Sequence, residues 1–148
     1  MRHVDQWGTE VIERAECLRL LDGEEVGRVG VSDHGSPLVL PVNYVLDGDT
    51  VVFRTAPGTK LEAALRAPVA FEVDRVDRGT RSGWSVVVRG VAEEVTSFSG
   101  PGVRQRLESL PLDTWAPGKK GCLIRIVPRS ITGRRLGAPL SRTSQAQR

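Results

Sequence analysis

One segment of the sequence places two cations, two hydroxyls and a glycine turn between an expected strand and an expected helix. It spans residues 53–61 and reads FRTAPGTKL. Each part suits a phosphate: the N–H groups that begin a helix are free donors, Arg54 can make a bidentate contact, and the hydroxyls of Thr55 and Thr59 can donate. Lys60 opposes the helix dipole, which a bound phosphate would compensate. The alternative is a hydrophilic turn with incidental charges; the glycine spacing of a nucleotide P-loop is missing.

Two other segments carry groups that suit a planar ligand. Residues 83–90, GWSVVVRG, open a long strand with Trp84 and Ser85, which could cover and hydrogen-bond an aromatic ring; the alternative is a core Trp and a strand-start Ser. In residues 40–44, LPVNY, Pro41 indicates an edge or a bulge with free backbone groups. Those groups and Asn43 could bind the polar edge of a heterocycle, although a protective Pro on an edge strand explains the pattern equally.

Composition restricts the class of protein that carries these segments. The chain has 148 residues, 39% of them hydrophobic and 26% charged, which suits one globular domain. The net charge is +3, but residues 1–133 hold 17 basic and 18 acidic side chains, so the excess lies in Arg134, Arg135, Arg142 and Arg148. With only 5% aromatic residues as well, a barrel that binds nucleic acid is not expected.

The chain shows no sign of a membrane span or of export. No apolar run approaches the length of a membrane span, and residues 1–10 contain no signal-peptide segment. Cys17 and Cys122 fit no metal-ligand spacing and are expected to be reduced thiols in or near a core. We therefore expect no metal site, no membrane contact and a cytoplasmic location.

The hydrophobic pattern predicts six strands and three short helices. Helices are expected over 10–21, after an N-cap at Thr9, and over 59–66 and 103–110. Strands are expected over 26–31, 38–46, 50–55, 69–74, 84–95 and 122–127. Residues 75–83 are polar and read as a loop, and Gly90 marks a bulge or a close approach. The short connections favour a small antiparallel barrel over residues 1–136, followed by a flexible C-terminal tail over 137–148.

Taken in order, these segments resemble the pyridoxamine 5′-phosphate oxidase-like flavin-binding split barrels. The resemblance covers about Glu16 to Leu136, nearly the whole domain. The segments that carry it are Gly27-Arg28, Pro41-Val42-Asn43, Phe53-Arg54-Thr55, Gly58-Thr59-Lys60, Phe71-Glu72-Val73-Asp74, Gly83-Trp84-Ser85-Val86 with Gly90, and Ile131-Thr132-Gly133-Arg134-Arg135-Leu136. No single motif is decisive, but the ordered set with matching spacing is specific.

The resemblance implies a six-stranded antiparallel split β-barrel that pairs as a homodimer, with flavin mononucleotide (FMN) in two clefts at the dimer interface. It assigns Arg54, Thr55 and Lys60 to the flavin phosphate, beside the Thr59 hydroxyl noted above, and Pro41, Val42 and Asn43 to the isoalloxazine edge. It places Ser85, beside Trp84, where the family often has a flavin-contacting Gln, and Trp115 as a cover from the partner subunit. Some relatives use a deazaflavin instead, and others bind haem. Haem is not expected here, because the only internal histidine, His34, lies in an expected turn.

The sequence departs from the oxidase itself at the substrate site. That enzyme handles pyridoxal phosphate with an Arg-x-His pair near its C-terminus, and this sequence has none. We therefore expect a flavin-dependent oxidoreductase that acts on another small molecule, with no catalytic residue identifiable from the sequence. A flavin carrier or sensor, a deazaflavin-dependent reductase and a bare dimerisation module are the alternatives.

Overall fold

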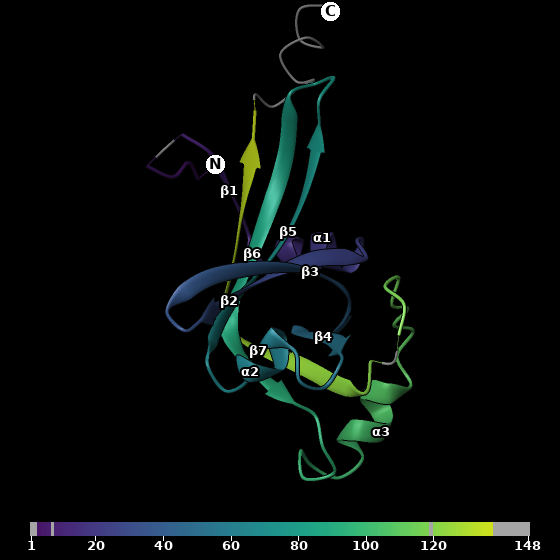
Figure 1. Cartoon of the computed structure of the whole chain (residues 1–148). Helices are drawn as coiled ribbons and strands as arrows, with labels where there is room; N and C mark the ends of the chain where they lie inside the picture. Colours follow the sequence, from purple (N-terminus) through teal and green to yellow (C-terminus); the bar gives the residue numbers. More distant parts are fainter. Residues whose placement is uncertain (1–2, 7, 119, 138–148) are drawn as a thin grey trace, which may run out of the picture.

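The computed structural model describes residues 3–6, 8–118 and 120–137, which form seven strands and three short helices (Figure 1). The elements are β1 (Glu10–Ile12), α1 (Arg14–Asp22), β2 (Val26–Asp33), β3 (Ser36–Asp47), β4 (Thr50–Thr55), α2 (Lys60–Ala63), β5 (Pro68–Asp77), β6 (Ser82–Glu94), α3 (Val103–Glu108) and β7 (Cys122–Leu136).

Six of the strands close into the predicted antiparallel barrel. Their order is β7-β4-β3-β2-β5-β6, and pairing of β6 with β7 completes the ring. The predicted turns are confirmed: residues 34 and 35 join β2 to β3 with φ of 50° and 83°, and Gly48 joins β3 to β4 with φ of 62°. Gly90 is also confirmed as a close approach, because a Cβ atom there would lie 2.1 Å from the Val127 carbonyl oxygen, where the register of β6 and β7 shifts.

The seventh strand, β1, corrects the prediction of a helix that begins at residue 10. Glu10–Ile12 instead pairs with β7, with Ile12 opposite Gly133, and α1 begins only at Arg14. Ile12 is buried, and a Cβ atom added to Gly133 would lie 3.2 Å from the Cβ atom of Ile12. The open edge of β7 therefore offers the β-branched Ile12 both backbone partners and burial, which helical spacing alone does not reveal.

The loop predicted over 75–83 is in fact a hairpin. β5 continues to Asp77 and β6 begins at Ser82, and the turn closes where the Asp77 Oδ1 atom accepts from the N–H groups of Gly79 and Thr80 at 2.8 and 3.1 Å. Figure 1 shows β5 and β6 extending beyond the barrel beside the end of β7, which continues nine residues past the predicted Val127. Polar side chains are tolerated there because both faces of the ribbon meet water.

The barrel interior holds the main core, and a smaller cluster lies on the outer face of β4 and β7. Phe71 and Phe53 are fully buried in the main core, and the Phe71 ring packs edge-on against Tyr44 with the centroids 4.9 Å apart. The smaller cluster packs Leu107 of α3 against β4 and β7. Both cysteines are buried free thiols, as predicted. Within the described residues, no helix has the length and apolarity needed to cross a membrane. Apart from Gly137, the predicted tail over 137–148 lies outside the described residues.

Candidate functional site

A cavity opens where the barrel splits between β3 and β4. The two strands pair from Asp47 opposite Thr50 to Tyr44 opposite Phe53. Beyond that point they separate: β3 pairs only with β2, and β4 stays paired with β7 as far as Thr55 opposite Cys122. The next residues, Asn43 on β3 and Arg54 on β4, therefore flank the opening.

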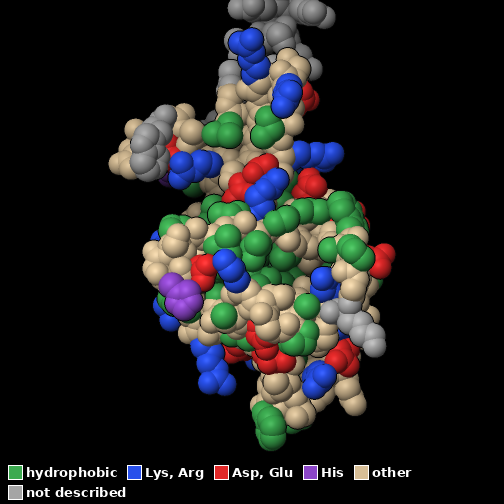
Figure 2. Space-filling view, viewed as in Figure 1, with side chains coloured by type: hydrophobic (Ala, Val, Ile, Leu, Met, Phe, Trp, Pro, Cys, Tyr) green, Lys and Arg blue, Asp and Glu red, His purple; other side chains and the backbone are tan. Residues whose placement is uncertain are grey.

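The cavity has a volume of about 520 Å³, within the range of small-molecule sites. Its lining combines aliphatic side chains with hydroxyls, an amide and three cations; the residues are Leu40, Pro41, Val42, Asn43, Arg54, Thr55, Ala56, Gly58, Thr59, Lys60, Leu61, Thr114, Ala116 and Lys120. Figure 2 shows hydrophobic side chains gathered across the middle of the molecule, where β3 and α2 lie in Figure 1, with separate Lys and Arg side chains beside them. Seven of the ten predicted cofactor residues thus meet in one cavity.

The segment that is predicted to bind phosphate lines this cavity. Arg54 lines it, and among the described residues no side chain or backbone group pairs with the Arg54 guanidinium. The Thr55 hydroxyl lies 3.0 Å from the Thr59 hydroxyl, and Thr59 caps α2 by accepting from Glu62 N at 3.2 Å. A free guanidinium that shares a cavity with two hydroxyls is a donor set that suits a phosphate oxygen.

Lys60 already has a counter-charge within the chain. Its Nζ atom lies 2.9 Å from the Oδ2 atom of Asp33, at the end of β2, and the Lys60 ammonium lowers the pKa of the Asp33 carboxyl. The pairing corrects one step of the sequence argument, because Asp33 compensates for Lys60 near the start of α2 without a bound phosphate. Lys60 still lines the cavity, so a ligand anion would share it with Asp33.

Asn43 fastens the segment after α3 to the cavity edge. Its Oδ1 atom accepts from Trp115 N at 2.8 Å, and its Nδ2 atom donates to the Glu25 carbonyl at 3.4 Å. The neighbours of Trp115 in the chain, Thr114 and Ala116, both line the cavity, while the Trp115 side chain is 67% exposed. Asn43 therefore holds a wall of the cavity in place, and its amide is engaged within the chain.

Trp84 and Ser85 do not line this cavity. Trp84 points into the barrel, is only 9% exposed and belongs to the main core. This agrees with the alternative interpretation of Trp84 as a core residue. Ser85 points the other way, as the next residue of a strand must, and its Oγ atom donates to Glu72 Oε2 at 3.2 Å. Ser85 therefore lies on the outer face of the sheet.

The same outer face carries a carboxyl group that the sequence did not single out. Glu72 lies opposite Arg28, which lies opposite Pro41 of the cavity. The Glu72 Oε1 atom is buried and accepts no hydrogen bond, and the nearest Arg28 nitrogen is 3.9 Å away. Burial and the neighbouring Asp74 carboxyl raise the pKa of Glu72 to about 7, against the opposing effects of Ser85 and Arg28.

This pKa predicts a stability that falls as the pH rises. Because the folded pKa lies above the ordinary 4.5, the folded protein binds this proton more tightly, and the contribution is lost as the pH rises from about 4.5 through about 7. Between pH 5 and pH 8, the unfolding free energy of the wild type should fall by about 1–2 kcal/mol more than that of the Glu72→Gln variant, after allowance for the partial exposure of Glu72.

Urea unfolding followed by circular dichroism at both pH values measures the difference. The matched control is Glu13→Gln, which changes an exposed glutamate before α1 and should keep the wild-type pH dependence. Identical pH profiles for the wild type and Glu72→Gln would contradict the assignment.

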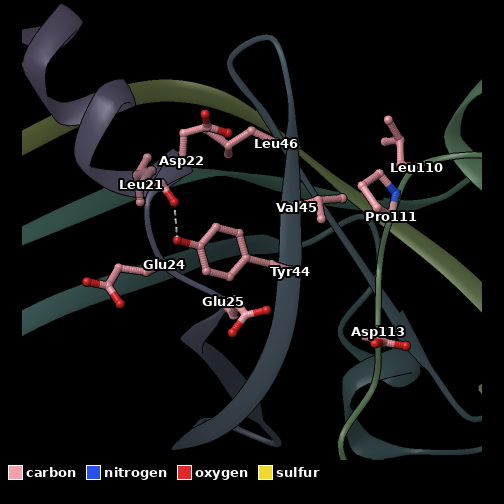
Figure 3. A pocket seen from close by; sticks show the side chains of 10 residues that line it. All are labelled: Leu21, Asp22, Glu24, Glu25, Tyr44, Val45, Leu46, Leu110, Pro111 and Asp113. Carbon is pink, nitrogen blue, oxygen red and sulfur yellow. Dashed lines mark hydrogen bonds between the residues drawn. The ribbon is translucent and has the colours of Figure 1, made fainter.

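A second cavity is lined by side chains on both sides of the β3 segment that carries Tyr44 and Val45 (Figure 3). It holds about 260 Å³, and four carboxylates line it: those of Asp22, Glu24, Glu25 and Asp113. The Tyr44 hydroxyl donates to the Leu21 carbonyl there. Because these carboxylates repel anions, a phosphate-bearing ligand suits the larger cavity better than this one.

Sequence reasoning also missed Lys120. This lysine lines the larger cavity, yet it follows a stretch without a recognisable motif. One signal was present: the chain has 18 arginines and only three lysines, and two of the three line the cavity. In the described part of the chain, no three His, Cys, Asp or Glu side chains are grouped so that they could hold a metal ion. The cavity can therefore hold an anionic ligand with an apolar body.

Comparison with known proteins supports one family assignment. The family model described as pyridoxamine 5′-phosphate oxidase matches residues 13–135. The uncharacterized protein Rv0080 of Mycobacterium tuberculosis is 36% identical over 141 residues, which cover 90% of each chain.

Solved structures agree with that assignment. The FAD-binding protein from Mycobacterium smegmatis is 35% identical with a TM-score of 0.73, over 85% of this chain and 97% of that one. An FAD-binding protein from Mesorhizobium loti is 26% identical with a TM-score of 0.68, over 88% and 98% of the two chains. The split barrel and the match over 13–135 together show that this chain belongs to the pyridoxamine 5′-phosphate oxidase family.

Proposed function

We propose that this protein binds a flavin nucleotide in the cavity between β3, β4 and α2, and that it is a flavin-dependent oxidoreductase. The observation that carries the proposal is the Arg54 guanidinium, which lines a cavity of about 520 Å³ and has no partner among the described residues. A buried or half-buried cation without a counter-charge favours an anionic ligand. A flavin nucleotide combines such an anion with a large apolar ring system.

Different residues of the cavity would contact different parts of the ligand. Arg54 and Lys60 would bind a flavin phosphate, with the Thr55 hydroxyl as a third donor. Pro41 and Val42 would contact the edge of the isoalloxazine ring from β3. When bound, the flavin supplies the hydride or electron transfer, and the protein supplies binding and orientation.

The choice between flavin nucleotides is part of the proposal. The family resemblance favours FMN, whereas two relatives of known structure, 35% and 26% identical, are described as FAD-binding proteins. A deazaflavin nucleotide presents a phosphate and a tricyclic ring as well, so the same residues would accept it. Direct titration with each nucleotide distinguishes them.

A flavin carrier is the second candidate, and one observation favours it. Among the described residues that line the cavity, none is a carboxylic acid, a histidine or a cysteine. The cavity thus contains no side chain with the ordinary pKa of a general acid or base at neutral pH. An enzyme with this lining would take its protons from water or from a neighbouring subunit.

We also propose that the chain works as a homodimer with shared cofactor clefts. Val39 lies two residues before Pro41 on β3 and is 62% exposed, next to the cavity. Ser85 and Glu72 lie on the continuation of this outer face, beyond Arg28. A second copy that covers the face would bury Val39 and bring outer-face groups to the flavin.

Binding of a flavin is the decisive expected result. The purified protein should be yellow, or should quench the fluorescence of added FMN or FAD, with a 1:1 ratio per chain and a solution mass twice that of the 16.1 kDa chain. The absence of binding to FMN, FAD and a deazaflavin at saturating concentration would overturn the proposal. Reoxidation of the reduced cofactor by quinones, nitroaromatics or enones then separates the enzyme from the carrier. If the protein is a carrier, none of these compounds would reoxidise its bound flavin faster than free flavin.

A further inference from the structure

A third cation, Lys120, lines the cavity from a different segment of the chain, just before β7. Cys122, the first residue of β7, lies directly opposite Thr55, the last residue of β4. Because the two strands are antiparallel, the residues that precede Cys122 run alongside those that follow Thr55. Lys120 therefore lies beside the turn between β4 and α2, and it lines the cavity together with Arg54 and Lys60.

Lys120 is available for a ligand in the same way as Arg54. No described residue forms an ion pair or hydrogen bond with the Lys120 side chain, which is half-buried. Lys60, by contrast, is bonded to Asp33 at 2.9 Å. Five residues before Lys120, the Trp115 N–H group donates to Asn43, so the segment that carries Lys120 is tied to the opposite edge of the cavity.

Cations from two separate segments, residues 54–60 and Lys120, suit two phosphate groups better than one. A phosphate monoester such as that of FMN concentrates its charge on a single group, which Arg54 and Lys60 can serve from β4 and α2. A diphosphate spreads a similar charge over two groups joined by a bridging oxygen. The ammonium of a lysine is a compact point charge on a flexible stem, suited to the second of these groups.

We propose that Lys120 binds the second phosphate of a flavin dinucleotide and so makes this cavity favour FAD over FMN. The inference rests on the proposed flavin function, and it assigns the preference to one side chain of the segment before β7. Arg54 and Lys60 would bind the phosphate that FMN and FAD share, whereas Lys120 contacts only the phosphate that FMN lacks.

The test compares the dissociation constants of FAD and FMN for the wild type and for Lys120→Ala, by fluorescence titration at pH 7.5. Removal of one charge-assisted contact at a half-buried site should weaken FAD binding about tenfold and FMN binding less than about twofold. Lys120→Arg, which keeps the charge, should retain the wild-type preference. Arg78→Ala is the matched control: it removes one positive charge at the β5–β6 turn, away from this cavity, and should alter neither affinity.

Each other outcome is decisive. Equal losses for FAD and FMN in Lys120→Ala would place Lys120 on the shared phosphate and overturn the inference while the proposed function stands. An unchanged FAD affinity would overturn it as well. A wild-type protein that binds neither flavin would reject the inference together with the proposed function.

Discussion

Replacing Arg54 with Ala is expected to weaken flavin binding about a hundredfold. Arg54 faces the cavity without a partner in the described part of the chain, so its guanidinium can give both of its parallel N–H donors to a phosphate. Hydrogen bonds to a charged group contribute about 1.5–3 kcal/mol each, and a hundredfold loss is about 2.7 kcal/mol. Titration of the cofactor that the wild type binds measures the loss directly.

Two companion variants separate charge from geometry. Arg54→Lys keeps the charge without the planar fork and should lie between the wild type and Arg54→Ala. Lys60→Ala should cost less, about five- to tenfold, because Lys60 must share its ammonium with Asp33. Thermal unfolding of each apoprotein checks that the barrel is intact. An Arg54→Ala affinity within about twofold of the wild type would reject Arg54 as the phosphate anchor.

Replacing Phe71 with Ala is expected to cost about 3–5 kcal/mol of unfolding free energy, a large part of the roughly 5–15 kcal/mol of a typical domain. Phe71 is fully buried, and its ring packs edge-on against Tyr44. The ring also occupies the space beside Gly27, where a Cβ atom would lie 2.2 Å from it. Because strands on both sides of β5 are fixed by the closed barrel, the cavity left by the ring cannot collapse.

Phe98→Ala is the matched control for this change. It removes the same side chain at a position that is 97% exposed, between β6 and α3, and should change stability by less than about 0.5 kcal/mol. Urea unfolding of both variants, followed by circular dichroism, gives the two values. A loss below about 1 kcal/mol for Phe71→Ala would mean that the barrel interior repacks freely around this position.

Local chemistry explains which parts of the molecule the sequence could predict. The turns at His34-Gly35 and at Gly48 follow from residues that tolerate positive φ, and Gly90 from its position within a long β pattern. That Arg54 and Lys60 line one cavity was predictable because they lie close together in the chain, on either side of one turn. Contiguous segments of this kind need no knowledge of strand pairing.

The parts that the sequence could not predict depend on cross-strand register. Lys120 joins the cavity only because Cys122 is paired with Thr55, and Glu72 meets Arg28 only because β5 lies beside β2. Trp84 and Ser85 are adjacent in the chain, yet strand alternation sends one to the core and the other to the outer face. The pairing of β1 with β7 likewise depends on residues that follow 121 to 125 positions later in the chain.

The position of β7 also governs when the barrel can form. This strand is the last in the described chain, and it pairs with β1, β4 and β6, so its partners lie far from it in sequence. During synthesis, β2 to β6 emerge first and can form hairpins, but the edges of β4 and β6 remain open until β7 leaves the ribosome. Such non-local closure slows folding. The nascent chain therefore depends on its final strand to cover two exposed edges that would otherwise pair with neighbouring chains.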